Sequence, residues 1–171
     1  MEAAGTLFDE RGYDTATVRE IGERAGLDAA LIARYFGSKE GLYLAALQQG
    51  RGPVPTDPAQ FVERMLSRSE ERGSGPVPLA MVSPTLTDPM REQVREIMGR
   101  RAVQPLVEEL AARGVPDPVL RTEILVAMAV GVSLTRASGT LPALAEAPLD
   151  EVVAVLEPMI VALQDAGAGS A

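Results

Sequence analysis

The sequence lacks several residue types on which enzyme chemistry commonly depends. Its 171 residues include no cysteine, no histidine and no tryptophan. Without cysteine there is no disulfide framework and no thiolate chemistry, and without histidine we expect neither a typical zinc site nor a histidine-dependent triad. The sequence also has no glycine-rich phosphate-binding loop. We therefore predict no catalytic, metal or cofactor site.

Aromatic residues and positive charges are also scarce. Aromatics make up 4% of the chain against 46% hydrophobic residues, so the core must be mainly aliphatic. Sixteen basic residues face 24 acidic ones, and the net charge of −8 has the wrong sign for a protein coated around nucleic acid. Any DNA contact must therefore depend on a few well-placed cations, among them Lys39, the one lysine of the chain.

Neither a signal peptide nor a membrane span is expected. The N-terminal segment MEAAGTLFDERG has no basic region followed by an apolar one. The longest apolar run, Ile124 to Leu134, is too short to cross a bilayer of about 30 Å. These patterns predict a soluble, cytoplasmic protein without a membrane partner.

Residues 17–37 carry the signals of two short helices joined by a tight turn. Thr17-Val18-Arg19-Glu20 fits the capping box, in which the two end side chains bind each other's backbone N–H groups. Gly26 suits the left-handed conformation that ends a helix. Asp28 can cap a second helix that ends at Gly37. The pattern predicts a helix-turn-helix.

A longer pattern surrounds these two helices in the first quarter of the chain. It consists of Leu7-Phe8, Arg11-Gly12-Tyr13, Thr15, Thr17 to Ile21, Ala25-Gly26-Leu27, Tyr35-Phe36 and Ser38-Lys39-Glu40. With these residues the segment resembles the DNA-binding domain of the TetR (tetracycline repressor) family of transcriptional regulators. Members of that family usually carry a basic segment before the first helix, and here the chain starts almost inside that helix.

The expected DNA contacts come from helix geometry and from this resemblance. In a helix-turn-helix the N-terminal part of the second helix faces base edges in the major groove. The resemblance implies phosphate contacts from Thr17, Tyr35 and Lys39, and an arginine at position 19 suits guanine. A plainer interpretation treats the arginines as solvated surface charges. The predicted DNA-binding residues are Thr17, Arg19, Asp28, Ala29, Ala30, Arg34, Tyr35 and Lys39.

Two positions depart from the family pattern. The family commonly has a phosphate-binding tyrosine where Ala33 stands and a serine where Asp28 stands, and a carboxylate there repels phosphate oxygens. Ala29 and Ala30 can offer only methyl contacts, as to thymine. We expect either modest DNA affinity or a shifted set of contacts.

Glycine and proline divide the rest of the chain into helical segments. Gly50 to Pro58 is rich in helix breakers and predicts a linker. Pro105 lies inside a long helical pattern, so we expect a kink or a break there. The predicted all-α fold has about nine helices, at residues 2–11, 18–25, 28–36, 39–48, 58–72, 77–86, 88–113, 118–138 and 149–166. The predicted domains are a helix-turn-helix DNA-binding domain (1–48), a linker with the start of the next helix (49–58), an effector-binding and dimerisation domain (59–166) and a disordered tail (167–171).

The last two long helices are the predicted dimer surface. The final helix is apolar nearly all round, and such a helix must be buried on all sides. Ala127 and Gly131 leave a smooth strip on the preceding helix, where another helix can approach. Ordinary monomer core is the alternative interpretation. The predicted interface residues are Ala127, Gly131, Val152, Leu156, Met159, Ile160 and Leu163.

Methionine is concentrated after the linker, and flexible methionines fill irregular cavities. TetR-like proteins bind effectors in this part of the chain, although scattered core methionine is the simpler interpretation of each residue. The predicted ligand-binding residues are Phe61, Met65, Met81, Leu86, Met98 and Met128.

These patterns together predict a homodimeric, ligand-responsive regulator that binds double-stranded operator DNA. The resemblance implies a repressor that a small, largely apolar effector releases from DNA. The first alternative is a helical ligand-binding or protein-interaction dimer that has lost sequence-specific DNA binding, as a net charge of −3 on residues 1–48 would favour. The second is an enzyme, which paired carboxylates of perturbed pKa would support.

Overall fold

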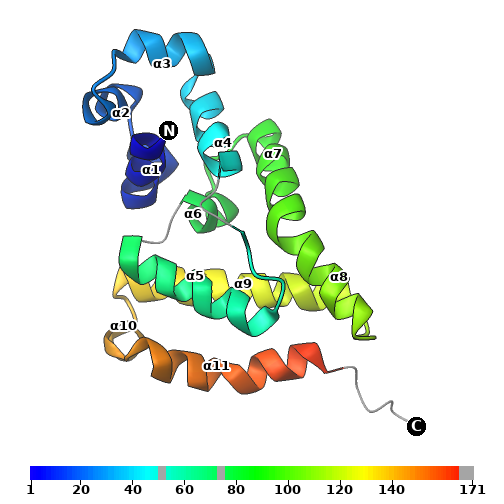
Figure 1. Cartoon of the computed structure of the whole chain (residues 1–171). Helices are drawn as coiled ribbons and strands as arrows, with labels where there is room; N and C mark the ends of the chain where they lie inside the picture. Colours follow the sequence, from blue (N-terminus) through cyan, green and yellow to red (C-terminus); the bar gives the residue numbers. More distant parts are fainter. Residues whose placement is uncertain (50–52, 73–75, 166–171) are drawn as a thin grey trace. The chain divides into compact units, whose positions relative to one another are not determined.

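The computed structural model describes residues 1–49, 53–72 and 76–165, and their regular structure is helical throughout (Figure 1). Two compact units form: an N-terminal unit of residues 1–52 and 72–97, and a C-terminal unit of residues 53–71 and 98–171. The predicted all-α class is confirmed, with eleven α-helices and one π-helix in the described ranges, against about nine expected. The predicted functional division at residues 48 and 59 stays a prediction; by contacts, residues 72–97 belong with the first four helices.

The first four helices of the N-terminal unit lie within one residue of their predicted bounds, except that α1 continues past the predicted stop at Gly12 to Thr15. They are α1 (Glu2–Thr15), α2 (Val18–Ala25), α3 (Ala29–Phe36) and α4 (Lys39–Gln49). Gly12 interrupts α1 with a non-helical backbone (φ 74°, ψ 177°), so the helical path that starts at Glu2 breaks at the predicted stop. Helices α6 (Pro76–Val82) and α7 (Asp88–Met98) complete the unit.

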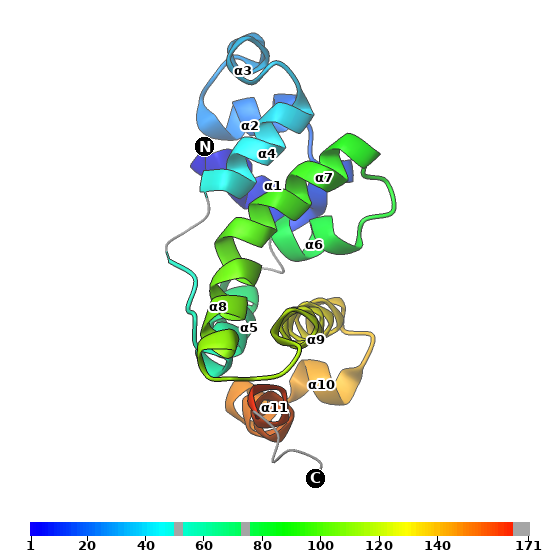
Figure 2. The ribbon, with the colours of Figure 1, turned by 90° about the vertical axis from the view of Figure 1, so that its right-hand side faces the viewer.

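Aromatic contacts join α1 to α4. Phe8 and Tyr43 are fully buried and pack edge to face, with ring centroids 4.9 Å apart. Tyr13 also packs against Tyr43, at the same centroid distance. Helix α6 packs on α1, where Leu79 lies next to Gly12. In both views α3 lies at the edge of its unit, with α2 and α4 on one side of it (Figures 1 and 2).

The C-terminal unit is built around helix α9. Its helices are α5 (Pro58–Arg72), the π-helix η1 (Gly99–Val103), α8 (Gln104–Ala112), α9 (Pro118–Ser138), α10 (Pro142–Glu146) and α11 (Leu149–Gln164). Helices α9 and α11 run side by side in both views (Figures 1 and 2). The core is aliphatic apart from one aromatic ring: Phe61, Val62, Leu66, Ala102, Leu106, Leu125, Val126, Ala129, Val130, Val152, Leu156 and Ile160.

The predicted break near Pro105 is confirmed, and it takes the form of a π-helix. Proline has no N–H and its ring crowds the carbonyl four residues earlier, so regular α-helical bonding cannot continue through it. The backbone widens over Gly99–Val103, and the Gln104 N–H donates to the Gly99 carbonyl five residues earlier. π-Helical segments are rare, and most of them are single turns inside a longer helix, as here.

Three expectations about the helices need adjustment. The short helix α10 follows a Leu-Pro step and was not predicted. Helix α6 ends at Val82, four residues earlier than expected, because Ser83 and Thr85 form a turn closed by their own side chains. By length and composition alone, helix α9 could span a membrane. The core helix of a folded domain meets the same two criteria. The predicted tail, 167–171, and Gly50 to Gly52 of the linker lie outside the described residues.

Candidate nucleic-acid interface

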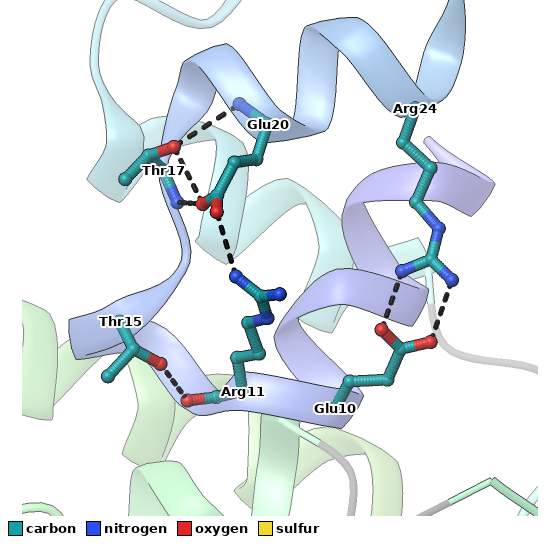
Figure 3. A network of polar contacts seen from close by, with 6 residues as sticks. All are labelled: Glu10, Arg11, Thr15, Thr17, Glu20 and Arg24. Atoms are coloured by element: carbon teal, nitrogen blue, oxygen red, sulfur yellow. Dashed lines mark hydrogen bonds and ion pairs between the residues drawn. The ribbon is translucent and has the colours of Figure 1, made fainter.

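The start of α2 is fixed by both halves of the capping box (Figure 3). The Glu20 N–H donates to the Thr17 hydroxyl at 3.2 Å, and the Thr17 N–H donates to the Glu20 carboxylate at 3.1 Å. The Thr17 hydroxyl also donates to that carboxylate at 2.7 Å. These bonds satisfy N–H groups that the first turn of a helix otherwise leaves unpaired.

Two glycines shape the turn between α2 and α3. Gly26 is left-handed (φ 66°, ψ 30°), and the next residue, Leu27, donates its N–H to the Gly22 carbonyl at 2.9 Å. A Cβ on Gly22 would lie 2.7 Å from the Leu27 carbonyl oxygen, so this close approach requires glycine. Gly26 was predicted from the sequence and Gly22 was not, because no sequence pattern marks where the turn backbone approaches α2 this closely.

Helix α3 turns one face inward and leaves the other exposed. Asp28 caps it by accepting the Ala30 N–H at 2.7 Å, as predicted. Ile32 is buried at 5% exposure, whereas Tyr35 is 80% exposed. Leu27, in the turn before α3, is 53% exposed. The exposed side chains of α3 are Ala30, Leu31, Ala33, Arg34 and Tyr35.

Most cations near this face already have carboxylate partners. Arg11 binds Glu20 at 2.7 Å, Arg24 binds Glu10 at 2.6 and 2.8 Å (Figure 3), and Arg19 binds Glu23 at 2.9 Å. Within the described residues, Arg34 and Lys39 form no ion pair. Arg34 lies on the exposed side of α3, and Lys39 is the first residue of α4, three residues after α3 ends.

Lys39 is held in place by α1. Its ammonium donates to the Asp14 carbonyl at 3.1 Å and lies 4.5 Å from the centre of the Tyr13 ring, as a cation–π pair does. An ammonium has three donors, so two remain for a phosphate. The Asp14 carboxylate accepts the Thr85 hydroxyl at 2.7 Å, which ties the segment after α6 to the end of α1.

Hydrogen bonds lower the pKa of two carboxyl groups in this region, and burial raises the pKa of one phenol. The pKa of Glu10 is lowered mainly by its hydrogen bond to Arg24, and the pKa of Glu20 mainly by its bonds to Thr17. Burial, followed by the nearby Glu40 and Asp14 carboxylates, raises the pKa of Tyr13. The lowered pKa values keep the Glu10 and Glu20 carboxylates charged beside Arg24 and Arg11. The described residues contain no cluster of three or more candidate metal ligands.

The predicted ligand-binding residues lie in both units. Phe61 belongs to the core of the C-terminal unit, and Met65, Met98 and Met128 are partly buried against that core. Met81 and Leu86 belong to the N-terminal unit, where Met81 is exposed and Leu86 is buried. A shared pocket for these six residues therefore stays a prediction.

The predicted dimer residues divide into a buried and an exposed group. Val152, Leu156 and Ile160 are 2–7% exposed in the single chain, inside the core of the C-terminal unit. Leu163 is half-buried against the same core. The exposed members are Ala127 and Gly131 on α9 and Met159 on α11.

The exposed group has apolar neighbours that the prediction omitted. Leu120 and Ile124 on α9 are 57% and 46% exposed, and Val155 on α11 is 69% exposed. Helical spacing places Leu120, Ile124, Ala127 and Gly131 on one side of α9, and Val155 with Met159 on one side of α11.

Both halves of the chain match known protein families. Residues 1–46 match a family described as bacterial regulatory proteins, tetR family. Residues 58–163 match a family described as tetracyclin repressor-like, C-terminal domain.

Individual relatives extend this likeness. The HTH-type transcriptional regulator BetI of Stenotrophomonas maltophilia (strain R551-3) is 49% identical over 49 residues, which is 29% of this chain and 25% of that protein. A TetR-family regulator from Streptomyces coelicolor A3 is 26% identical, with a TM-score of 0.54 over 95% of this chain and 91% of the other. FadR from Bacillus subtilis, solved in complex with stearoyl-CoA, is 15% identical, with a TM-score of 0.66 over 97% and 96% of the two chains.

Proposed function

Because the chain belongs to the TetR family of bacterial transcriptional regulators, we propose that it is a ligand-responsive regulator that binds operator DNA through α2 and α3. One observation carries the proposal. Helix α3 exposes a whole face at the edge of its unit, and Arg34 on that helix and Lys39 just after it form no ion pair with any described residue. The proteins of this family in the comparison are regulators rather than enzymes.

The proposed contacts follow from the geometry of a helix-turn-helix. Helix α3 enters the major groove, where Arg34 can meet a guanine edge or a phosphate. Thr17, Tyr35 and Lys39 bind phosphates, and Lys39 keeps its bond to Asp14 while it does so. Arg19 leaves its exposed pair with Glu23 to reach a base, at small cost because such surface pairs contribute about 0–1 kcal/mol.

A two-fold dimer gives the proposed regulator two reading helices. A second copy of this chain presents an identical apolar face, so a two-fold dimer would bury the apolar residues that α9 and α11 expose. Two copies would then read half-sites separated by about one turn of the duplex, roughly 34–36 Å, or somewhat more. The chain itself is expected in the cytoplasm, where its operator lies.

The proposed effector is small and largely apolar, and the protein acts as a repressor that the effector releases. The partly buried Met65, Met98 and Met128 against the aliphatic core support this class of ligand. FadR, which has the same fold, binds stearoyl-CoA, so a long-chain acyl-CoA is one sensible probe. An effector can act by favouring a dimer in which the two α3 helices no longer match the duplex.

DNA binding is tested by selecting duplexes from a randomised pool, together with a gel shift on DNA upstream of the protein's own gene. We expect an enriched sequence whose affinity falls with salt, because phosphate contacts release counterions. Arg19→Ala should cost about 1–3 kcal/mol on the selected site and relax base preference there. Lys39→Ala should weaken binding to every duplex and reduce the salt slope.

Arg64→Ala is the matched control, because Arg64 is an exposed arginine of the C-terminal unit. It should leave both affinity and salt slope unchanged. A pool that yields no enriched sequence, with no shift on the upstream DNA, would overturn the proposal.

A second function keeps one specific observation in its favour. Residues 1–48 carry five basic and eight acidic residues, and three of the five cations are already paired with carboxylates. An excess of acidic residues, with most cations already paired, is what a helical ligand-binding or protein-interaction dimer without DNA binding would show. The same selection experiment separates the two functions, since that dimer enriches no sequence at any salt concentration.

A further inference from the structure

The exposed face of α3 is mostly apolar. Its sequence, AALIARYF, contains no asparagine, glutamine, serine, threonine or lysine. Arg34 and Tyr35 are therefore its polar side chains, and the rest of the exposed face consists of Ala30, Leu31 and Ala33. Leu31 is 44% exposed, and Leu27 in the preceding turn is 53% exposed.

Helical spacing gathers these groups at one place. Each residue turns the helix by about 100°, so Ala30 and Arg34 lie opposite the buried Ile32, with Leu31 beside them. Leu31 lies on the same outward side of α3, next to Arg34, which contacts DNA in the proposed function. An aliphatic group at this place contributes little to the core and can meet whatever α3 contacts.

Base chemistry decides what such a face can recognise. In the major groove, adenine is read by paired donors and acceptors, which asparagine and glutamine supply, and guanine is read by arginine. Thymine carries a 5-methyl group, which apolar side chains contact. Because α3 has no asparagine or glutamine, it lacks the side chains that recognise adenine by paired hydrogen bonds. Its exposed alanines and leucine can instead contact the methyl group of thymine.

We propose that α3 specifies thymine through its 5-methyl group, with Leu31 and Ala30 as the contacting residues and Arg34 as the neighbouring polar contact. This inference rests on the proposed function and names the base that the site reads. Thymine should recur in each half-site of the selected sequence, next to the position that Arg34 contacts.

The test replaces thymine by uracil in the selected duplex, one position at a time. Uracil pairs identically and lacks only the methyl group. Removing one buried carbon should weaken binding about fourfold, and replacing the equivalent thymines of both half-sites should weaken it about fifteenfold. Thymines outside the protected region, replaced in the same way, should have no effect.

A paired variant assigns the effect to a residue. Leu31→Ala should bind the thymine site more weakly and should lose most of the difference between thymine and uracil, as contacting groups do in a double-mutant cycle. Leu141→Ala is the matched control, because Leu141 is 52% exposed and lies in the C-terminal unit. It should keep the full difference, and thermal melting should show both variants folded.

The outcomes separate this inference from the function on which it rests. No enriched sequence means that the proposed function fails. An enriched sequence without thymine, or one in which uracil binds equally well, overturns the inference while the function stands. A uracil penalty that Leu31→Ala retains overturns the assignment to Leu31, and one that Ala30→Gly retains as well overturns the inference, because the methyl groups then contact another residue.

Discussion

Arg24 donates to both carboxylate oxygens of Glu10, at 2.6 and 2.8 Å, and so joins α2 to α1 (Figure 3). A second bridge between the same helices runs from Arg11 to Glu20, whose carboxylate also completes the capping box. The two pairs orient the helix-turn-helix against α1. They also neutralise two of the five cations in residues 1–48, which leaves DNA binding to Arg34, Lys39 and the weakly held Arg19.

These carboxylates predict a loss of stability in acid. Their pKa is lower in the folded chain, so their contribution is fully present above the ordinary carboxyl pKa and disappears as pH falls through the lowered one. Glu10→Gln should therefore reduce the free energy of unfolding near neutral pH. The difference from the parent chain should shrink in acid, as urea unfolding at about pH 7 and about pH 3 would show. Glu123→Gln, at an exposed carboxylate without an ion pair in the described residues, should show no such convergence.

Removing the N-cap of α2 should destabilise the N-terminal unit. Thr17→Ala leaves the Glu20 N–H without its acceptor, and the loss of such a cap costs about 1 kcal/mol, within a range of about 0.5–2. Thr17→Ser keeps the hydroxyl and should retain most of the stability. Chemical denaturation measures both variants. Equal losses for alanine and serine would mean that the threonine methyl group, and not the cap, stabilises the unit.

Local signals in the sequence were enough to locate most helices. The capping box at Thr17, the glycine at position 26 and the cap at Asp28 act within a few residues, so their geometry follows from the chain itself. The break before Pro105 is of the same kind, because proline forbids regular bonding wherever it lies.

Long-range relationships could not be predicted in this way. Hydrophobic spacing shows which residues share a helical face, but it does not show what covers that face. Ile160, for example, was assigned to a dimer surface and is buried within the single chain. The pairing of Glu10 with Arg24 depends on the packing of two helices, which no local pattern encodes.

The burial of Ile160 changes how the proposed dimer should be tested. A charge at Ile160 would disrupt the core of the C-terminal unit, so loss of folding and loss of the dimer would be confounded. Met159, which precedes Ile160 on α11, is 54% exposed, so a charge there can disrupt the dimer without disrupting the core. Met159→Glu should give a folded monomer, because a buried charge at an apolar interface has no partner.

Sedimentation measures the mass of the Met159→Glu protein, and circular dichroism checks that it stays helical. Leu141→Glu, at a similarly exposed leucine outside α9 and α11, should leave the mass unchanged. A Met159→Glu protein that sediments as a dimer would rule out the α9 and α11 face as the interface.

Two hydroxyl groups on α9 are buried without a hydrogen-bond partner among the described residues, those of Thr122 and Ser133. An unpaired buried polar group costs about 1–3 kcal/mol, and valine has nearly the shape of threonine. Thr122→Val should therefore stabilise the chain by about 1 kcal/mol in urea unfolding. Thr135→Val on the same helix is the control, because the Thr135 hydroxyl donates to the Gly131 carbonyl at 2.6 Å and its loss should not stabilise. A Thr122→Val chain that is less stable than its parent would show that this hydroxyl has a partner in solution, and a bound molecule in the C-terminal unit would then be the first partner to test.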